Sequence, residues 1–198
     1  MTFSKEFLAE SVAVISAIDS DRIEDVANGL AAVRERGGRL FILGVGGSAG
    51  HASHAVNDFR KICDIEAYAP TDNVSELTAR ANDDGWDTTF SSWLKGSRLN
   101  EKDALLIFSV GGGDEVKNVS ANIVAALKLA VERQTPIYGI VGRDGGATAR
   151  LGTATVVIPP LFGDHITPHT EGLCAVIWHL LVTHPALSRA ATRWESIK

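Results

Sequence analysis

The sequence predicts an α/β protein whose parallel β-sheet is covered by helices on both faces. Short apolar runs that can form buried strands alternate along the chain with segments of helical periodicity. Three of the apolar runs are followed by glycine-rich turns, at 44–47, 111–113 and 145–146. Because ligands of such sheets bind outside the carboxyl ends of the strands, we expect the functional site at these turns.

The composition indicates one soluble globular domain. The chain has 198 residues, of which 45% are hydrophobic and 22% charged. A net charge of −5 argues against a nucleic-acid partner. The two cysteines, Cys63 and Cys174, are too far apart in the sequence to suggest a thiolate zinc site or a disulfide framework. Apolar runs too short for a bilayer and an acidic N-terminal segment predict a cytoplasmic protein without a membrane anchor.

Two amphipathic helices are expected before the first strand, at 4–19 and 21–36, and the second ends at Gly37-Gly38. Since no strand precedes them, these helices have no sheet of their own to cover. They can form a helical hairpin that packs on the domain or on a partner subunit, and the partner is the favoured interpretation. Residues 1–38 are therefore predicted to make oligomer contacts, 39–185 to form the α/β core, and 186–198 to form a solvated tail.

The first strand is expected at 40–43, an apolar run that ends in glycine. Gly44, Gly46 and Gly47 allow a sharp turn and a close approach of a ligand to the main chain. Ser48 is a good N-cap for a helix through Asp58. Strand, turn and helix N-terminus together predict an anion site. The turn alone is a weak signal, and it lacks the G-x-G-x-x-G spacing of dinucleotide sites.

Further along the chain, strands and helices continue to alternate. The remaining strands are expected at 67–70, 104–110, 136–141 and 154–158, and the remaining helices at 74–81, 88–94, 116–133 and 169–183. The last of these helices is strongly apolar. Between two of the helices, Asn82-Asp83-Asp84-Gly85 predicts a turn or loop.

Two pairs of side chains with metal-ligand chemistry lie on two of these helices. His54 and Asp58 are one turn apart, so both can reach one ion. Glu171 and His179 are eight residues apart, about 80° around a helix, in an otherwise apolar segment where polar groups need partners. Two imidazoles and two carboxylates suit zinc, although other divalent ions accept them. The alternative is a satisfied core histidine at 179 and a mere helix-end charge at 171.

Three other histidines lie outside these two pairs. His51 is either an alternative ligand or, as we prefer, a residue that lines the pocket. His165 and His169 flank the Pro168 region and can reach the pocket mouth, but solvated loop histidines are the more common case. Cys174 lies among apolar residues and is expected to be an unreactive thiol.

Four motifs stand out along the chain: residues 44–58, Asn82-Asp83-Asp84-Gly85-Trp86, Gly142-Arg143-Asp144-Gly145-Gly146, and Glu171 with His179 eight residues later. Together they resemble the sugar isomerase (SIS) domain, and within it the phosphoheptose isomerases. The similarity extends from about residue 5 to residue 185. It implies a three-layer αβα sandwich around a flavodoxin-like sheet, a homotetramer with sites built across subunits, and one zinc ion per subunit between two helices.

The resemblance also implies an activity. It is the metal-dependent interconversion of sedoheptulose 7-phosphate and D-glycero-D-manno-heptose 7-phosphate through an enediol. The implied metal ligands are His54, Asp58, Glu171 and His179, with acid/base roles at Asp58 and His179. Such an isomerisation moves a proton between C1 and C2, and we expect Asp58 or Glu171 to carry it while His179 exchanges a proton with the neighbouring oxygen.

The sugar phosphate is expected at the glycine turns. The residues predicted to bind it are Gly46, Gly47, Ser48, Asp83, Asp84, Ser109, Gly111, Gly112 and Gly113. The family usually has Asn at Val45, Glu at Asp58, Gln at Glu171, and a Ser/Thr-rich loop where this chain has 110–113. Asp114 places a carboxylate beside the expected phosphate unless it turns outward. Three alternatives stay open: a non-catalytic sugar-phosphate-binding or adaptor protein, an isomerase of another phosphorylated sugar, and, least favoured, a nucleotide-binding domain.

Overall fold

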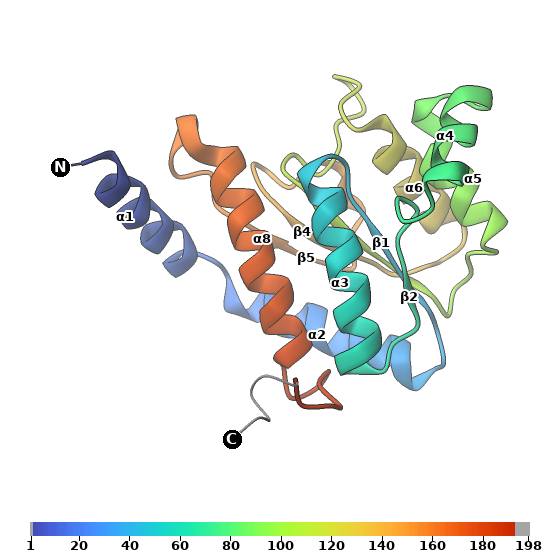
Figure 1. The fold of residues 1–198 in the computed structure, drawn as a ribbon, viewed down its shortest axis with the longest axis horizontal. Helices are drawn as coiled ribbons and strands as arrows, with labels where there is room; N and C mark the ends of the chain where they lie inside the picture. Colours follow the sequence, from blue (N-terminus) through green and yellow to red (C-terminus); the bar gives the residue numbers. More distant parts are fainter. Residues whose placement is uncertain (1, 193–198) are drawn as a thin grey trace.

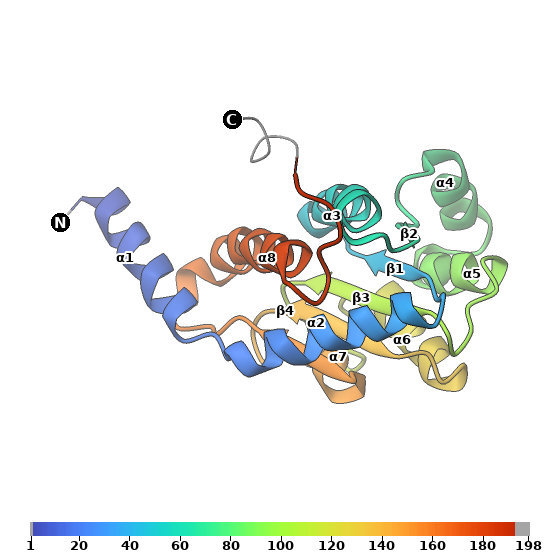
Figure 2. The ribbon, with the colours of Figure 1, turned by 90° about the horizontal axis from the view of Figure 1, so that it is seen from below.

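The computed structural model describes residues 2–192, and at its centre is a five-stranded parallel sheet (Figures 1 and 2). The strand order is β2-β1-β3-β4-β5, and every neighbouring pair is parallel. This is the flavodoxin-like order, so the predicted sheet is confirmed. The strands are β1 (Leu40–Leu43), β2 (Ala67–Tyr68), β3 (Ala104–Ser109), β4 (Ile137–Val141) and β5 (Ala154–Val157).

Helices cover both faces of the sheet and complete the predicted three layers. Alternate side chains of β1 enter opposite cores: Leu40 and Ile42 face one way, Phe41 and Leu43 the other. The first face is covered by α2 (Ser20–Glu35), α3 (Gly47–Cys63) and α8 (Ile166–Thr183), and the second by α5 (Thr89–Gly96), α6 (Ala121–Glu132) and α7 (Gly146–Leu151). The remaining helices are α1 (Phe3–Ser16), α4 (Val74–Asp83) and two 3₁₀ turns, Trp86–Thr88 and Gly163–His165.

The two N-terminal helices are present but do not form the expected hairpin. In α2, Val26, Leu30 and Val33 are completely buried in the core beneath the sheet, so this helix does have a sheet face to cover. In contrast, α1 leads away from α2 and lies against α8 (Figures 1 and 2). Four large apolar side chains of α1 are exposed in the single chain, namely Phe3, Leu8, Val12 and Ile15.

The helix predicted at 116–133 begins only at Ala121. Ser120 has a left-handed backbone with φ of 53°, which separates α6 from the preceding segment. That segment is a loop closed by an antiparallel bridge between Asp114 and Val119. Val119, which the predicted helix would have included, is therefore exposed in this loop.

Three other local predictions need correction. The N-cap of α3 is Gly46, with φ of 62°, while Ser48 is buried in the first turn. Helix α8 begins at Ile166, three residues before the expected 169. Pro168 is tolerated there because it lies in the first turn, where a backbone N–H has no partner within the helix. The expected solvated tail starts later, since Leu187 is buried and Arg34 donates to its carbonyl at 2.7 Å. Residues 193–198 of that tail lie outside the described residues.

Both cysteines are buried free thiols, which confirms the expected apolar surroundings of Cys174. Burial raises the pKa of Cys63 to about 12, and it also raises the pKa of Cys174. Neither thiol is therefore poised as a nucleophile or a metal ligand. Among residues 2–192, no helix combines the length and apolar character that crossing a bilayer requires.

At Gly112, the glycine turn at 111–113 lies in contact with the turn at 145–146. The φ of Gly112 is 68°, and a Cβ there would lie 1.9 Å from the carbonyl oxygen of Gly145. Its own carbonyl accepts hydrogen bonds from the N–H and the hydroxyl of Thr148. We expect Gly112→Ala to lower the free energy of unfolding by about 3 kcal/mol, through backbone strain and overpacking. Urea denaturation measures this. Gly163→Ala, where a Cβ meets no atom within 4 Å, serves as the control, and equal stability of the two variants would contradict the expectation.

Candidate active site and metal centre

Three of the four predicted metal ligands come together where α3 and α8 lie side by side (Figure 1). His54 and Asp58 on α3 and His179 on α8 each offer one ligand atom, and these atoms lie within 4.8 Å of one another. His54 Nε2 is 3.6 Å from Asp58 Oδ2, and the rings of His54 and His179 are 5.5 Å apart between centroids. Two imidazoles and one carboxylate form the ligand set of many catalytic zinc sites, which leave a fourth position open.

Neighbouring groups orient these donors. His179 Nδ1 lies 2.7 Å from the carbonyl oxygen of Ala175, so we assign the hydrogen to Nδ1, which leaves Nε2 free for an ion. The Asn57 side chain donates to Asp58 Oδ1 at 2.8 Å, which leaves Oδ2 on the side of His54. The buried Trp178 ring lies 4.7 Å from the His54 ring and stacks on His179. The donor chemistry and its supports therefore fit a divalent ion.

The group of three ligands is more exposed to solvent than the apolar sequence around His179 suggests. The His54 side chain is 58% exposed and His179 is exposed, whereas the Asp58 side chain is only 15% exposed. His179 is therefore not a satisfied core histidine, which was the alternative interpretation of its place in an apolar helix. Its imidazole stands at the surface of the single chain, where an ion and a substrate have access.

Glu171, the fourth predicted ligand, is not part of this group. Its carboxylate lies against Gly47, the first residue of α3, where a Cβ would come within 2.7 Å of Oε1. The N-terminal end of a helix favours a carboxylate because of the free N–H groups and the helix dipole. Along α8, about 12 Å of helix separates Glu171 from His179. Among the described residues, His51, the alternative ligand, does not belong to the group either.

A polar cavity of about 310 Å³ opens beside Glu171, at the carboxyl ends of β1 and β3. Its polar side chains are those of Ser48, Ser109, Ser120, Arg143, Thr167 and Glu171. The Ser109 hydroxyl oxygen accepts the N–H of Gly112 at 3.0 Å, so its own hydrogen remains available to a ligand. Four hydroxyl groups and a guanidinium around one cavity provide the hydrogen bonds and charge that an anionic ligand needs.

The other residues predicted to bind the substrate do not all line this cavity. Gly111 lines the cavity, but the N–H of Gly112 is already bonded, and Gly113 lines a neighbouring pocket. Asp83 and Asp84 are exposed at the end of α4 and line neither of these two cavities. Helix α4 lies at the opposite end of the molecule from α1 (Figures 1 and 2). Within one chain, the two aspartates are therefore not brought to the polar cavity.

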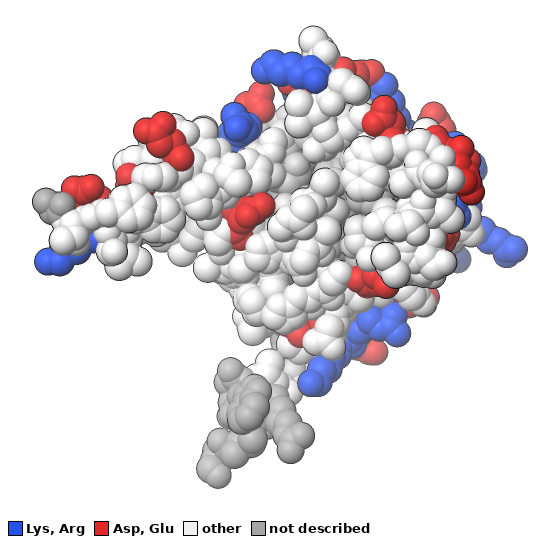
Figure 3. Space-filling view, turned by 45° about the horizontal axis from the view of Figure 1, so that its top comes forward, with Lys and Arg blue, Asp and Glu red and all other residues white. Residues whose placement is uncertain are grey.

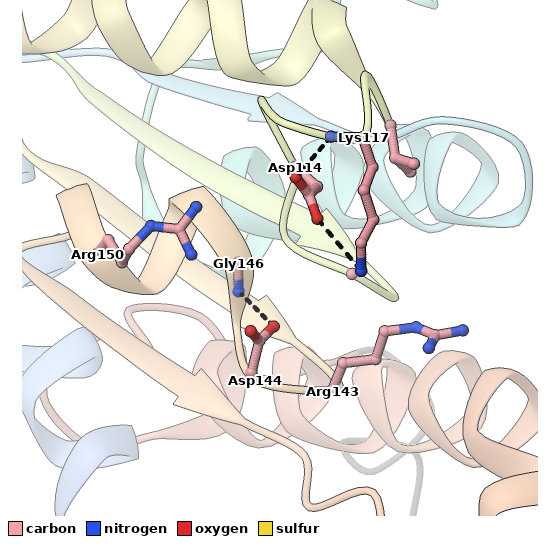
Figure 4. A pocket seen from close by; sticks show the side chains of 9 residues that line it. Asp114, Lys117, Arg143, Asp144, Gly146 and Arg150 are labelled. Atoms are coloured by element: carbon pink, nitrogen blue, oxygen red, sulfur yellow. Dashed lines mark hydrogen bonds and ion pairs between the residues drawn. The ribbon is translucent and has the colours of Figure 1, made fainter.

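The neighbouring pocket, about 330 Å³ in volume, shows where Asp114 points (Figure 4). Asp114 Oδ1 accepts the backbone N–H groups of Val116 and Lys117, and Oδ2 is 3.8 Å from the Lys117 ammonium. These bonds, that from Lys117 first, hold the pKa of the Asp114 carboxyl below its usual value. The carboxylate thus binds its own loop, and Asp114 does not line the cavity of Ser109. Arg143 lines both cavities and can face a ligand in either.

Sequence reasoning missed Ser120, Arg143 and Thr167 as cavity residues. Ser120 was hidden inside a helix predicted to start too early, although a serine before the Ala-Asn-Ile run is a typical helix start. Arg143 was part of a quoted motif, and its position directly after β4 was a usable signal. No local pattern marks Thr167, which reaches the cavity because α8 begins earlier than predicted.

Comparison with known proteins gives a family and several relatives. The family model for the SIS domain matches residues 6–142. Phosphoheptose isomerase of Aneurinibacillus thermoaerophilus is 30% identical over 189 residues, covering 90% of this chain and 90% of that protein. The lincomycin biosynthesis protein LmbN of Streptomyces lincolnensis is 32% identical over 155 residues, or 73% of this chain, and the match spans only about half (54%) of that protein.

Solved structures agree with this relationship. Phosphoheptose isomerase GmhA from Neisseria gonorrhoeae superposes with a TM-score of 0.79 at 25% identity, covering 91% of this chain and 96% of that chain. A phosphoheptose isomerase from Francisella tularensis gives a TM-score of 0.76 over 92% of this chain and 97% of that chain. At 23% identity, the second likeness concerns the fold alone.

Proposed function

The chain belongs to the SIS domain family, and from that premise we propose that it is an aldose–ketose isomerase that converts sedoheptulose 7-phosphate into D-glycero-D-manno-heptose 7-phosphate. The observation that carries the proposal is the convergence of His54, Asp58 and His179 from two helices. The cavity lined by hydroxyl groups and Arg143 lies further toward the start of α8, at Thr167 and Glu171. Similarity to proteins named phosphoheptose isomerase, over nearly the whole chain, supports the choice of substrate.

One zinc ion per subunit is our proposal for the cofactor, held by His54, Asp58 and His179. When bound, such an ion polarises the carbonyl oxygen of the substrate as a Lewis acid. The ligand role defines what His179 does: with Nδ1–H donated to Ala175 and Nε2 directed to the ion, it has no ring nitrogen left for acid/base work. We therefore assign His179 to metal binding and orientation, and not to proton exchange.

Glu171 is the carboxylate that we propose moves the proton between C1 and C2. It is outside the group of three ligands, and its carboxylate, which lies against Gly47 in the single chain, has to turn along α8 toward that group to reach C1 of a substrate held there. The family usually has Glu and Gln at the two carboxylate positions, whereas this chain has Asp58 and Glu171. Compared with the family, this chain thus has a shorter carboxylate on α3, at Asp58, and an additional carboxylate on α8, at Glu171. This combination favours Glu171 on α8 as the catalytic base.

The phosphate group is proposed to bind in the cavity of about 310 Å³. The hydroxyl groups of Ser48, Ser109 and Ser120 donate hydrogen bonds, and the Arg143 guanidinium supplies the balancing charge. Ser48 also lies in the first turn of α3, where the helix dipole favours an anion.

We further propose a cytoplasmic homotetramer. The exposed apolar side chains Phe3, Leu8 and Val12 on α1 suit a subunit interface, because burying them removes apolar surface from water. The face seen in Figure 3 is largely uncharged, and its lysine, arginine and acidic side chains lie mostly toward the margins. Two buried free thiols are consistent with a reducing compartment.

The test of the proposed function is incubation of the purified, zinc-loaded protein with sedoheptulose 7-phosphate while aldose signals are followed by NMR. We expect the aldose 7-phosphate to appear, with a deuteron from D₂O incorporated at C2. A second candidate, an isomerase of another phosphorylated sugar, is favoured by the unusual 110–119 loop and by the relative that takes part in lincomycin biosynthesis. Turnover of a different ketose phosphate alone would select it, and no turnover of any would leave a sugar-phosphate-binding protein.

A further inference from the structure

A second group of metal-ligand side chains lies outside the proposed active site. Glu10 on α1, His165 in the 3₁₀ turn and His169 on α8 place their ligand atoms within 4.8 Å of one another. Glu10 Oε2 is 2.7 Å from His165 Nδ1 and 2.9 Å from His169 Nε2. His169 and His179 are ten positions apart on α8, so the two groups lie about 15 Å apart along the helix. We propose that Glu10, His165 and His169 form a second zinc-type divalent metal site, which fastens α1 to α8.

The hydrogen bonds around His169 favour a cation at this position. The Ser11 hydroxyl donates to the carbonyl oxygen of Phe7 at 2.9 Å, so it can only accept from His169 Nδ1, 3.4 Å away. A hydrogen on Nδ1 leaves the lone pair of Nε2 directed at Glu10. A lone pair and a carboxylate oxygen 2.9 Å apart repel each other, so either a second ring proton or a metal ion must lie between them. A metal-bound histidine typically has this arrangement, with its second nitrogen donating to an oxygen.

The surroundings strengthen the case. His169 is only 4% exposed, and the Glu10 and His165 side chains are 20% and 29% exposed. The Phe7 ring stacks on His169 with centroids 4.5 Å apart, and Phe3 and Phe7 meet the edge of His165. A carboxylate in such apolar surroundings is costly unless its charge is balanced. The interpretation of His165 and His169 as solvated loop histidines is therefore wrong.

The site also explains the position of α1. This helix projects from the body of the molecule and contacts α8 beside this group (Figures 1 and 2). An ion held by one ligand from α1 and two from the start of α8 ties the two segments together. With two imidazoles and one carboxylate, the donor set suits zinc or cobalt better than magnesium or calcium.

Metal content decides the proposal. Each protein is loaded with ZnCl₂, desalted and analysed by inductively coupled plasma mass spectrometry. We expect two zinc ions per chain in the wild type, one in Glu10→Gln/His165→Asn, one in His54→Asn/Asp58→Asn, and none in the fourfold variant. His184→Asn, which removes a histidine that pairs with Glu24 and accepts the N–H of Ala186, is the matched control and keeps two. If Glu10→Gln/His165→Asn binds as much zinc as the wild type, the second site does not exist.

Cobalt spectroscopy provides a readout that does not depend on stoichiometry alone. In the His54→Asn/Asp58→Asn background only the second site remains, and added Co²⁺ is expected to produce visible d–d bands. The single, nearly isosteric change Glu10→Gln should weaken or remove them while the circular dichroism spectrum stays unchanged. Full-strength bands after Glu10→Gln, or no bands in the parent variant, would overturn the proposal.

Discussion

Replacing His54 or His179 by Asn is expected to lower kcat by about 10³-fold and to remove the active-site zinc. Each substitution deletes one of the three donors that converge within 4.8 Å, and two remaining ligands hold an ion poorly. The lost rate reflects the stabilisation of developing charge that a bound divalent ion supplies, which is worth several kcal/mol. Steady-state kinetics with sedoheptulose 7-phosphate and zinc analysis of the same samples measure both effects.

The control for this prediction is His184→Asn, which changes the histidine at the C-terminal end of α8 that pairs with Glu24. It should leave kcat within about twofold of the wild type, since His184 belongs neither to the group of three ligands nor to the lining of the polar cavity. Chelation of the wild-type protein should reproduce the loss of activity, and added zinc should restore it. Wild-type rates in a His54→Asn protein that contains no metal would contradict the proposed role of the group.

Glu171→Gln is expected to lower kcat by about 10²- to 10⁴-fold while the zinc bound by His54, Asp58 and His179 is retained. The amide keeps the shape of the side chain but cannot accept the proton from C1, and general base catalysis typically contributes this much. The measurement combines kcat with exchange of the C1 hydrogen in D₂O, which reports the proton transfer directly.

Asp58→Asn is the matched comparison, because it alters the other carboxylate of the proposed site. We expect it to lose zinc as well as activity, whereas Glu171→Gln loses activity alone. An active Glu171→Gln enzyme would place the base elsewhere and favour Asp58, to which the resemblance assigns an acid/base role. The two variants thus separate a metal ligand from a proton carrier.

Most of the fold was predictable because it depends on patterns that a single sequence carries. The buried strands, the glycine turns after β1, β3 and β4, and the parallel arrangement all follow from apolar runs and their spacing. Errors occurred where tertiary contacts override local preference. The left-handed Ser120 and the bridge between Asp114 and Val119 depend on packing, and periodicity therefore extended α6 over them.

The candidate site was predictable to a similar extent. Helical spacing pairs His54 with Asp58, and the apolar surroundings of His179 marked it as unusual, so these three could be found from the sequence. The place of Glu171 could not, since it depends on the contact of its carboxylate with Gly47 across two helices. Glu10 was also missed, because its relation to His165 and His169 spans more than 150 residues.

The most direct test of the proposed metal centre is a crystal structure of the zinc-loaded protein with anomalous data at the zinc edge. We predict a peak between α3 and α8, about 2.0–2.2 Å from a nitrogen of His54, an oxygen of Asp58 and Nε2 of His179. The carboxylate of Glu171 should be free to meet the substrate. An active, zinc-containing protein with no ion at these three residues would contradict the assignment.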